Sequence, residues 1–385
     1  MEFFVENINL VIFIPLIMCC IIGFNGLVSN KIDKTTLFSL SVALAFASLI
    51  FCGAAFDYSV VKNLSESTNF QWLSFDVINF YLGTYLDKTS AFFLLCTGTI
   101  CFLIQNVAYF KLGDREDFPR LLFYLNLFTF GLNGIFISPN LFQSYVFCEI
   151  TGVASYLLIN FDFSNREQSK AGIKSFIYNR IGDLTLFFCV LTVMYYAVTY
   201  NSLFDTNALA YANMNNLATC INSLMSPSLF IFFCSVLIFV IIMKFMHAFI
   251  YIVFESKEKG ALARIVLYQN SLIALVGLFF FIRFNPFFFS LAEQWIWTPP
   301  VIILLFVTLG ILNRFFIPIC KIFGWIEKYI VETVINITEL VIRGLSYLSG
   351  KLQGGNFQSY LIYSLFGLIS ISAFVLIFYI LLIKG

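Results

Sequence analysis

The stretch LFQSYVFCEITGVASYLLI, residues Leu141–Ile159, is apolar almost throughout and carries a single charged residue, Glu149. A second apolar stretch, residues 229–254, holds Lys244 near its middle. A charge at the centre of a bilayer costs about 2.5–3.5 kcal/mol on insertion scales, so such a residue normally faces a protein interior or a water-filled cavity and has a function there. These stretches predict membrane-spanning helices, and their charges predict where the function lies.

The composition of the whole chain agrees with a membrane location. The chain has 385 residues, of which 60% are hydrophobic and 11% are charged, and its mean hydropathy is +0.91. Soluble domains carry about 25% charged residues, so this chain has too little polar surface for a soluble protein. The net charge of +1 provides no basic field for binding nucleic acid.

Apolar runs of about 20 residues, the length that spans a bilayer, recur along the chain. They are long and continuous, whereas a transmembrane β-barrel has short alternating runs. We therefore predict an all-α polytopic membrane protein with about ten transmembrane helices. The predicted spans are 9–29, 36–56, 89–110, 119–138, 141–160, 172–198, 228–254, 262–284, 295–320 and 359–384.

The loops between these runs alternate in charge. Eleven lysines and arginines lie in the loops after the first, third, fifth and seventh spans, against three after the second, fourth, sixth and eighth. Basic loops stay on the cytoplasmic or matrix side. The N-terminus is therefore predicted on the opposite side, which in a mitochondrion is the intermembrane space.

The segment 323–353 has a different pattern, because apolar residues recur every three or four positions among charged ones. This pattern is typical of an amphipathic helix that lies along a membrane surface. The predicted organisation is three N-terminal helices, a five-helix unit, a helix with a Pro-Pro start, the amphipathic helix and a terminal helix. The corresponding ranges are 1–110, 111–287, 288–322, 323–353 and 354–385.

The charged residues within the spans suggest proton handling. Burial disfavours the charged form of a lysine and a nearby carboxylate favours it, so a Glu149–Lys244 pair of variable separation would be a switchable proton site. His247 lies one helical turn from Lys244 and could relay the proton. The alternatives are a structural ion pair for Glu149 and hydrogen-bonded packing for His247. Arg180 and Asp183, three residues apart, are interpreted as an intrahelical pair or as anchors to neighbouring helices.

No chemistry beyond proton transfer is indicated by the sequence. The chain has ten cysteines but one histidine, and the cysteines are interpreted as small buried apolar residues. The sequence has no phosphate-binding loop, no nucleophile constellation and no carboxylate–histidine cluster. We therefore expect no catalytic, metal or cofactor site on this chain alone.

Several motifs in these stretches resemble one family. The run CEITGVASYLLI, residues 148–159, is similar to the family's WE-x-x-G-x-x-SYLLI, and NRIGD, residues 179–183, to its NR-[VI]-GD. The residues from Leu86 to Ser90 are similar to the start of its third helix, where Asp87 is predicted to be a structural polar residue at a helix interface. The segment LQGGNFQSY, residues 352–360, is similar to the family's tail. The chain thus resembles subunit 5 of the proton-pumping NADH:ubiquinone oxidoreductase, respiratory complex I.

The resemblance implies a membrane-arm subunit that translocates protons, with Glu149 and Lys244 at the positions of the family's gating pair. NADH, FMN, iron–sulfur clusters and ubiquinone would then be bound by other subunits. The implied partners are the other membrane-arm subunits and lipids such as cardiolipin. Fifty phenylalanines hint at an AT-rich organellar genome, so the implied location is the mitochondrial inner membrane.

The departures from the family leave alternatives open. Gln269 occupies the position of a histidine, the prolines that usually follow the lysine are missing, and the second of two inverted five-helix repeats is not found. The chain could be a shortened scaffold subunit of the distal membrane arm that has lost pumping. A separate chain could supply the missing repeat, or protons could leave through a neighbour. A subunit of a multisubunit sodium/proton antiporter is the remaining alternative.

Overall fold

The computed structural model describes residues 7–27, 32–75, 78–162, 166–199, 209–254 and 260–294. They all belong to one compact unit, Met1–Ile302. Seven helical segments in this part are long and apolar enough to cross a membrane, and a shorter apolar helix precedes them. The chain is therefore an all-α multi-pass membrane protein, as predicted. The principal helices are α2 Leu10–Leu27, α3 Lys34–Phe56, α4 Lys88–Leu112, α5 Phe118–Ile137, α6 Leu141–Ile159, α7 Arg166–Thr199, α9 Pro227–Phe254, α10 Ala261–Ser271 and α11 Ile273–Arg283.

The first eight predicted spans coincide with these helices. The eighth, predicted as one span, is divided at Leu272, which is the C-cap of α10 and the N-cap of α11. The predicted spans 295–320 and 359–384 and the amphipathic helix 323–353 lie outside the described residues. Shorter elements that were not predicted are the π-helix η1 Asp57–Val61, the 3-10 helix η3 Tyr211–Asn213, α8 Met214–Leu224 and α12 Asn285–Gln294.

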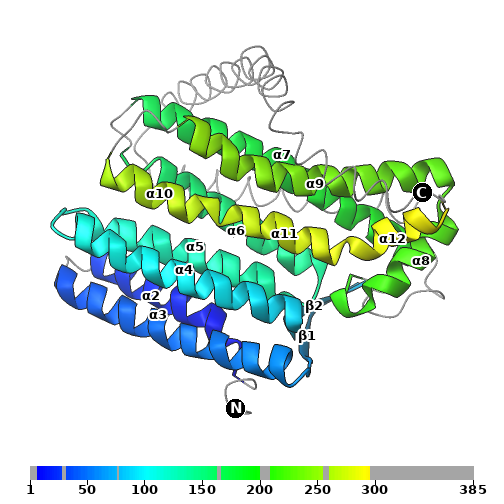
Figure 1. Ribbon diagram of the computed structural model, residues 1–385, viewed down its shortest axis with the longest axis horizontal. Helices are drawn as coiled ribbons and strands as arrows, with labels where there is room; N and C mark the ends of the chain where they lie inside the picture. The colour runs from blue at the N-terminus through cyan, green and yellow to red at the C-terminus, as the bar shows by residue number, and fades with distance from the viewer. Residues whose placement is uncertain are drawn as a thin grey trace, which may run out of the picture. The chain divides into compact units, whose positions relative to one another are not determined.

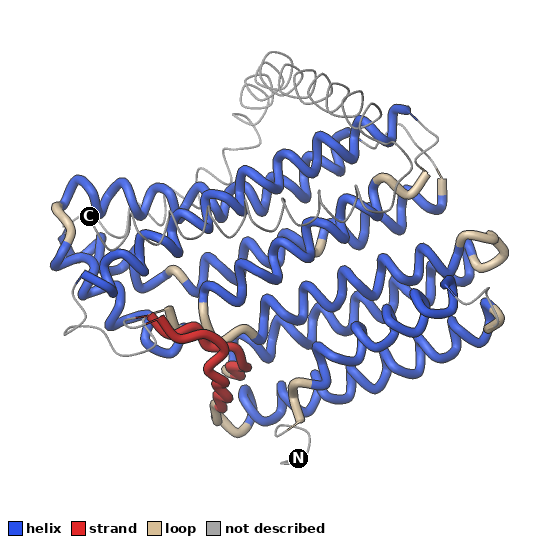
Figure 2. Tube along the Cα trace, turned by 180° about the vertical axis from the view of Figure 1, so that it is seen from behind, coloured by secondary structure: helices blue, strands red, loops and turns tan. Residues whose placement is uncertain are grey.

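The long helices lie side by side and pack mainly against their neighbours in the sequence (Figure 1). Helix α3 contacts α4, α4 contacts α5, and α5 contacts α6; helix α2 packs against both α3 and α5. On the other side α6 contacts α7, α7 contacts α9, and α9 contacts α11. Helix α10 lies against both α4 and α6, so the eighth span returns to the middle of the bundle. The same arrangement is visible from behind (Figure 2).

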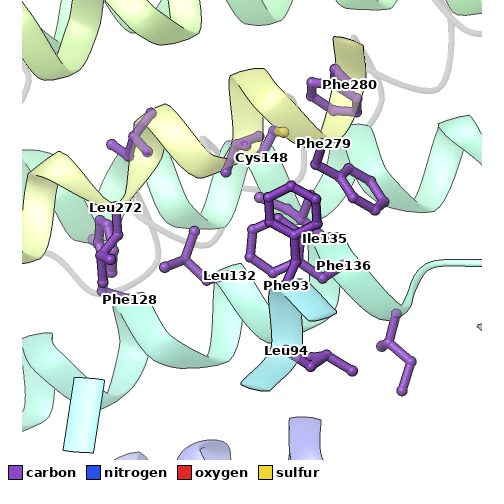
Figure 3. Packing of buried hydrophobic residues seen from close by; sticks show 14 of the residues in the cluster. Phe93, Leu94, Phe128, Leu132, Ile135, Phe136, Cys148, Leu272, Phe279 and Phe280 are labelled. Atoms are coloured by element: carbon purple, nitrogen blue, oxygen red, sulfur yellow. The ribbon is translucent and has the colours of Figure 1, made fainter. Parts of the chain in front are cut away.

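Phenylalanine rings fill the centre of the bundle, where α4, α5 and α11 meet (Figure 3). Phe93 stacks on Phe136 with ring centroids 5.2 Å apart. Phe279 approaches both rings edge-on, at 5.7 and 5.2 Å. All three side chains are buried. Offset and edge-to-face geometries suit the charge distribution of aromatic rings, so this cluster fixes α11 against the earlier helices.

A two-stranded antiparallel hairpin connects η1 to α4 at one end of the bundle (Figures 1 and 2). Its strands are β1 Glu66–Phe75 and β2 Ile78–Leu86. Gln143 on α6 fastens the hairpin, because its amide accepts from Gly83 N and donates to Gly83 O, both at 3.0 Å. A Cβ at Gly83 would lie 1.8 Å from Thr68 O on the opposite strand. A side chain at this position is therefore excluded by the cross-strand contact.

Candidate functional site

Lys244 on α9 is the most deeply buried base among the described residues, with 3% of its surface exposed. Its ammonium forms an ion pair with Asp183 on α7, which is fully buried. Asn179, one turn before Asp183, completes the group: its Oδ1 accepts from Lys244 Nζ at 3.2 Å and its Nδ2 donates to Asp183 Oδ2 at 2.9 Å. Every member of this triad has a charged or hydrogen-bonding partner, which is the condition for burying charge in a membrane.

Glu149 on α6 pairs with Arg180 on α7. The Arg180 guanidinium also donates to the main-chain oxygen of Glu149 at 3.4 Å and lies 4.6 Å from the ring centroid of Phe176. Unlike the Lys244 triad, this pair is partly accessible, with side-chain exposures of 26% for Glu149 and 24% for Arg180. The two ion pairs share α7, because Arg180 and Asp183 both project from it.

The observed partners differ from the predicted ones. The sequence suggested a Glu149–Lys244 pair, whereas the structure joins Glu149 to Arg180 and Lys244 to Asp183. Of the two interpretations of Arg180 and Asp183, anchoring to neighbouring helices is the one observed. The reason is geometric: α7 packs between α6 and α9, so its charges meet those of both helices. His247 lies in α9, but its side chain is outside the described residues.

Two glycines allow the three helices to approach closely enough for these contacts. A Cβ at Gly152 on α6 would lie 2.1 Å from Asn179 Nδ2 and 3.6 Å from Asp183 Oδ2. A Cβ at Gly182 on α7 would lie 3.1 Å from Met243 Cβ on α9. Small residues at helix contacts are a common means of close packing in membranes. Here they bring the buried amide and carboxylate into the α6–α7 interface.

A second ion pair, with Arg283 buried and Asp87 partly buried, lies at the end of the bundle that carries the hairpin. Asp87, predicted as a structural residue, caps α4 by accepting from Ser90 N at 2.8 Å. It also receives two bonds from Arg283 at the end of α11, of 2.7 and 2.9 Å. Burial raises the pKa of the Asp87 carboxyl, but the Arg283 charge and the hydrogen bonds lower it further, so this pKa lies below its ordinary value. The pair fixes the start of α4 to the end of α11.

Arg283 was not identified as a site residue from the sequence. It was counted as a loop charge, but it is 8% exposed and surrounded by aromatic rings. Its Cζ lies 4.9 Å from the centroids of Tyr211 and Phe279 and 5.4 Å from that of Tyr85. The available signal was its place directly after the apolar run LFFFI, residues 278–282. This position puts Arg283 at the membrane boundary, where a charge needs an ionic partner.

Residues 138–315, which include the whole Lys244 site, match the model of the NADH:quinone oxidoreductase/Mrp antiporter transmembrane family. Over these residues the chain is similar to this family of antiporter-like subunits. Its relatives include the chloroplast NAD(P)H-quinone oxidoreductase subunit 5 of Chara vulgaris, 29% identical over 231 residues, which are 59% of this chain and 33% of the relative. The corresponding subunit of Physcomitrium patens is 32% identical over 199 residues, 50% of this chain and 27% of the relative.

A solved structure shows the same fold. A chain in the structure of respiratory complex I from Thermus thermophilus with bound NADH superposes with a TM-score of 0.54 at 18% identity, covering 74% of this chain and 54% of that one. This antiporter-like chain matches no more than a third of the length of the two curated relatives above. Both are chloroplast proteins, so they do not test the predicted mitochondrial location.

Proposed function

We propose that this antiporter-like chain is a proton-translocating membrane-arm subunit of an NADH:quinone oxidoreductase, in which Lys244 is the proton-carrying group. The observation that carries the proposal is the triad of Lys244, Asp183 and Asn179, held inside membrane-spanning helices. The names of the relatives support the choice of complex. Quinone reduction would take place on other subunits and would drive the site through conformational change.

The triad has the properties of a switchable proton site. With Asp183 in contact, the charged ammonium of Lys244 is stabilised. If α7 moves and separates the two groups, burial favours the neutral amine, so Lys244 releases a proton to a neighbouring water and later takes one up again. Arg180 and Asp183 lie one turn apart on α7. A movement of α7 therefore changes the Glu149–Arg180 pair at the same time as the Lys244–Asp183 pair.

The partly accessible Glu149–Arg180 pair indicates where a neighbour binds. About a quarter of each side chain is exposed at the depth of the membrane, where charge facing lipid is costly. We propose that another membrane-arm subunit covers this pair. The neighbour could also be the separate chain that supplies a second repeat, and lipids such as cardiolipin would occupy the remaining surface. The distribution of basic loops supports an orientation with the N-terminus on the side opposite those loops; the mitochondrial inner membrane stays a prediction.

The test is the proton-to-electron ratio of the intact enzyme carrying Lys244→Met or Asp183→Asn. We expect at least about a tenfold loss of proton pumping, because each substitution removes a group whose charge the other needs. Lys62→Met is the matched control, since Lys62 forms an exposed pair with Asp57. Unchanged pumping in a fully assembled Lys244→Met enzyme would contradict the proposal and favour the scaffold function.

Native gel electrophoresis of mild-detergent extracts separates the complex from the antiporter alternative. A subunit of the oxidoreductase should migrate with a complex that also contains NADH dehydrogenase activity. Migration of the chain in an assembly without that activity would favour a multisubunit sodium/proton antiporter.

A further inference from the structure

A row of small and polar residues leads from the Lys244 triad along one face of α6 toward the hairpin end of the bundle. Gly152, Cys148 and Ser144 follow one another at intervals of four residues, which places them on the same face of the helix. A Cβ at Gly152 would lie 3.6 Å from Asp183 Oδ2, and the Cys148 thiol lies within electrostatic range of Lys244 and Asp183. Cys148 is 1% exposed and Ser144 is fully buried, so the row lies inside the protein.

The row continues from α6 to Tyr211, which lies in the connection between α7 and α8. Its hydroxyl donates to Ser144 Oγ at 2.8 Å. Two main-chain hydrogen bonds hold this connection against the start of α6, from Tyr211 N to Pro139 O at 2.9 Å and from Leu141 N to Leu209 O at 3.1 Å. Burial raises the pKa of the Tyr211 phenol, so the hydroxyl stays neutral. A neutral hydroxyl both donates and accepts, and it can therefore take up one proton while it gives up another.

Beyond Tyr211 the row reaches Arg283, a residue 8% exposed. The Arg283 Cζ lies 4.9 Å from the ring centroid of Tyr211. Its Nε is buried and has no hydrogen-bond partner among the described residues. A buried donor without a partner costs about 1–3 kcal/mol, and an internal water is a common partner for such a group. The surroundings of Arg283 beside Tyr211 therefore match internal water rather than dry packing.

The far end of the row lies on the side of the membrane opposite the basic loops. Asp87, the ion-pair partner of Arg283, has 20% of its side chain exposed and is the N-cap of α4. Arg283 ends α11, and Tyr211 belongs to the connection that follows α7. These positions follow the second, eighth and sixth predicted spans, whose loops carry few basic residues. The row therefore joins Lys244 to the side that would receive pumped protons.

We propose that this row is an outlet through which Lys244 releases protons directly to the hairpin end of this chain. The ammonium of Lys244 gives a proton to water beside Cys148. The hydroxyls of Ser144 and Tyr211 then pass it on, each accepting one proton and giving up another. Arg283 holds the last water at the mouth of the outlet without changing its charge.

The inference rests on the proposed function, because Lys244 is the group that releases the proton. It adds where the proton leaves. Release along this row requires neither a second five-helix repeat nor a neighbouring chain, because every group of the outlet belongs to helices that this chain already contains.

The first experiment removes one hydroxyl of the row and keeps its ring. In sealed vesicles that contain the intact complex, Tyr211→Phe should lower the proton-to-electron ratio severalfold. Tyr195→Phe is the matched control, because Tyr195 lies four residues from the end of α7 at the same end of the bundle but is 60% exposed. A purely structural Tyr211–Ser144 hydrogen bond would lower the unfolding temperature of Tyr211→Phe and leave its ratio unchanged, which would overturn the outlet.

Lys244→Met, measured in the same vesicles, separates the outlet from the proposed function. Loss of pumping in Lys244→Met with an unchanged ratio in Tyr211→Phe would overturn the outlet and leave the Lys244 site intact. Unchanged ratios in both variants would contradict the proposed function, and the outlet with it.

The second experiment tests for water in the row without measuring pumping. Thiols react with methyl methanethiosulfonate as thiolates, and apolar surroundings keep a buried thiol protonated. In the intact complex the thiol of Ser144→Cys should therefore react at least about tenfold faster than the native Cys189 and Cys234, which are each 1% exposed and lie outside the row. Labelled peptides would be quantified by mass spectrometry. Equal, slow labelling of all three thiols would overturn the outlet.

Discussion

The Asp87–Arg283 pair shows what a single buried charge requires in this protein. Arg283 is surrounded by three aromatic rings, and Asp87 is its ion-pair partner. Removing one partner leaves the other charge uncompensated. We expect Arg283→Leu to lower the free energy of unfolding by about 3–5 kcal/mol, the cost typical of breaking a buried pair.

Thermal unfolding in detergent, followed by tryptophan fluorescence, would measure this loss. The double variant Asp87→Leu/Arg283→Leu should recover part of it, because no isolated charge remains. Lys62→Leu breaks an exposed pair and should change stability by about 1 kcal/mol or less. Equal destabilisation by Arg283→Leu and Lys62→Leu would show that the Asp87–Arg283 pair contributes no more to the free energy of unfolding than an exposed pair does.

The same pair predicts a dependence of stability on pH. The pKa of Asp87 is lower in the folded protein than its ordinary value, about 3.9 in an unfolded chain. A lowered carboxyl pKa contributes stability that is present above about pH 4 and is lost as the pH falls through the folded pKa. Wild-type protein should therefore lose stability more steeply below about pH 4 than Asp87→Leu/Arg283→Leu. Parallel acid unfolding curves would contradict this assignment.

The sequence did not reveal which charged residue forms an ion pair with which. Glu149, Lys244, Arg180 and Asp183 were all recognised, because charge inside an apolar run is conspicuous. Their pairing was not, because Lys244 and Asp183 are 61 residues apart and meet only through the packing of α7 against α9. A glutamate has no feature in the sequence that prefers a lysine to an arginine.

At the scale of helices, contact distances depend on glycine. The Cβ of an alanine at position 152 would overlap Asn179 Nδ2, which lies 2.1 Å from that position. We expect Gly152→Ala to destabilise the protein by about 1–3 kcal/mol and to reduce pumping by displacing Asn179. Gly53→Ala is the control, because a Cβ at Gly53 has no neighbour within 4 Å.

Both glycine variants would be compared by thermal unfolding and by the proton-to-electron ratio. If displacement of Asn179 is the cause, Gly152→Ala combined with Asn179→Ala should recover stability but not pumping. A stability loss in Gly53→Ala as large as that in Gly152→Ala would instead indicate a general effect of removing glycine from these helices.

The helices were predictable from the sequence and the hairpin was not. Long apolar runs predict the helices from α2 through α7 and from α9 through α11, because a chain segment that crosses the membrane must be apolar and must pair its own backbone groups. Residues 66–86 fall in the loop after the second predicted span, because neither β1 nor β2 is an apolar run long enough to cross a bilayer. Their stability comes from a contact far away in the sequence, the two bonds from Gln143 to Gly83, and a local pattern does not reveal such a contact.

For the molecule as a whole, the charged loops predict a definite orientation in the membrane. Asn63 lies after the second span and Asp114 after the third, and both are exposed. We expect Asn63→Cys and Asp114→Cys to be labelled by an impermeant maleimide from opposite sides of sealed vesicles, with Asp114→Cys reacting from the side of the basic loops. Labelling of both from the same side would contradict the predicted orientation.

The separation of Asp87 and Arg283 by 196 residues also sets an order of events during biosynthesis. At about 5–20 residues per second, the ribosome completes Arg283 roughly 10–40 s after Asp87. During that interval the Asp87 carboxylate at the start of α4 lacks the Arg283 guanidinium. It therefore stays at the water–lipid boundary without this ion pair while the next spans are inserted. The insertion of α11 then packs this helix against α4 and α5 in one late step. Nascent chains that stop short of Arg283 should consequently be the ones that quality-control proteases recognise and degrade.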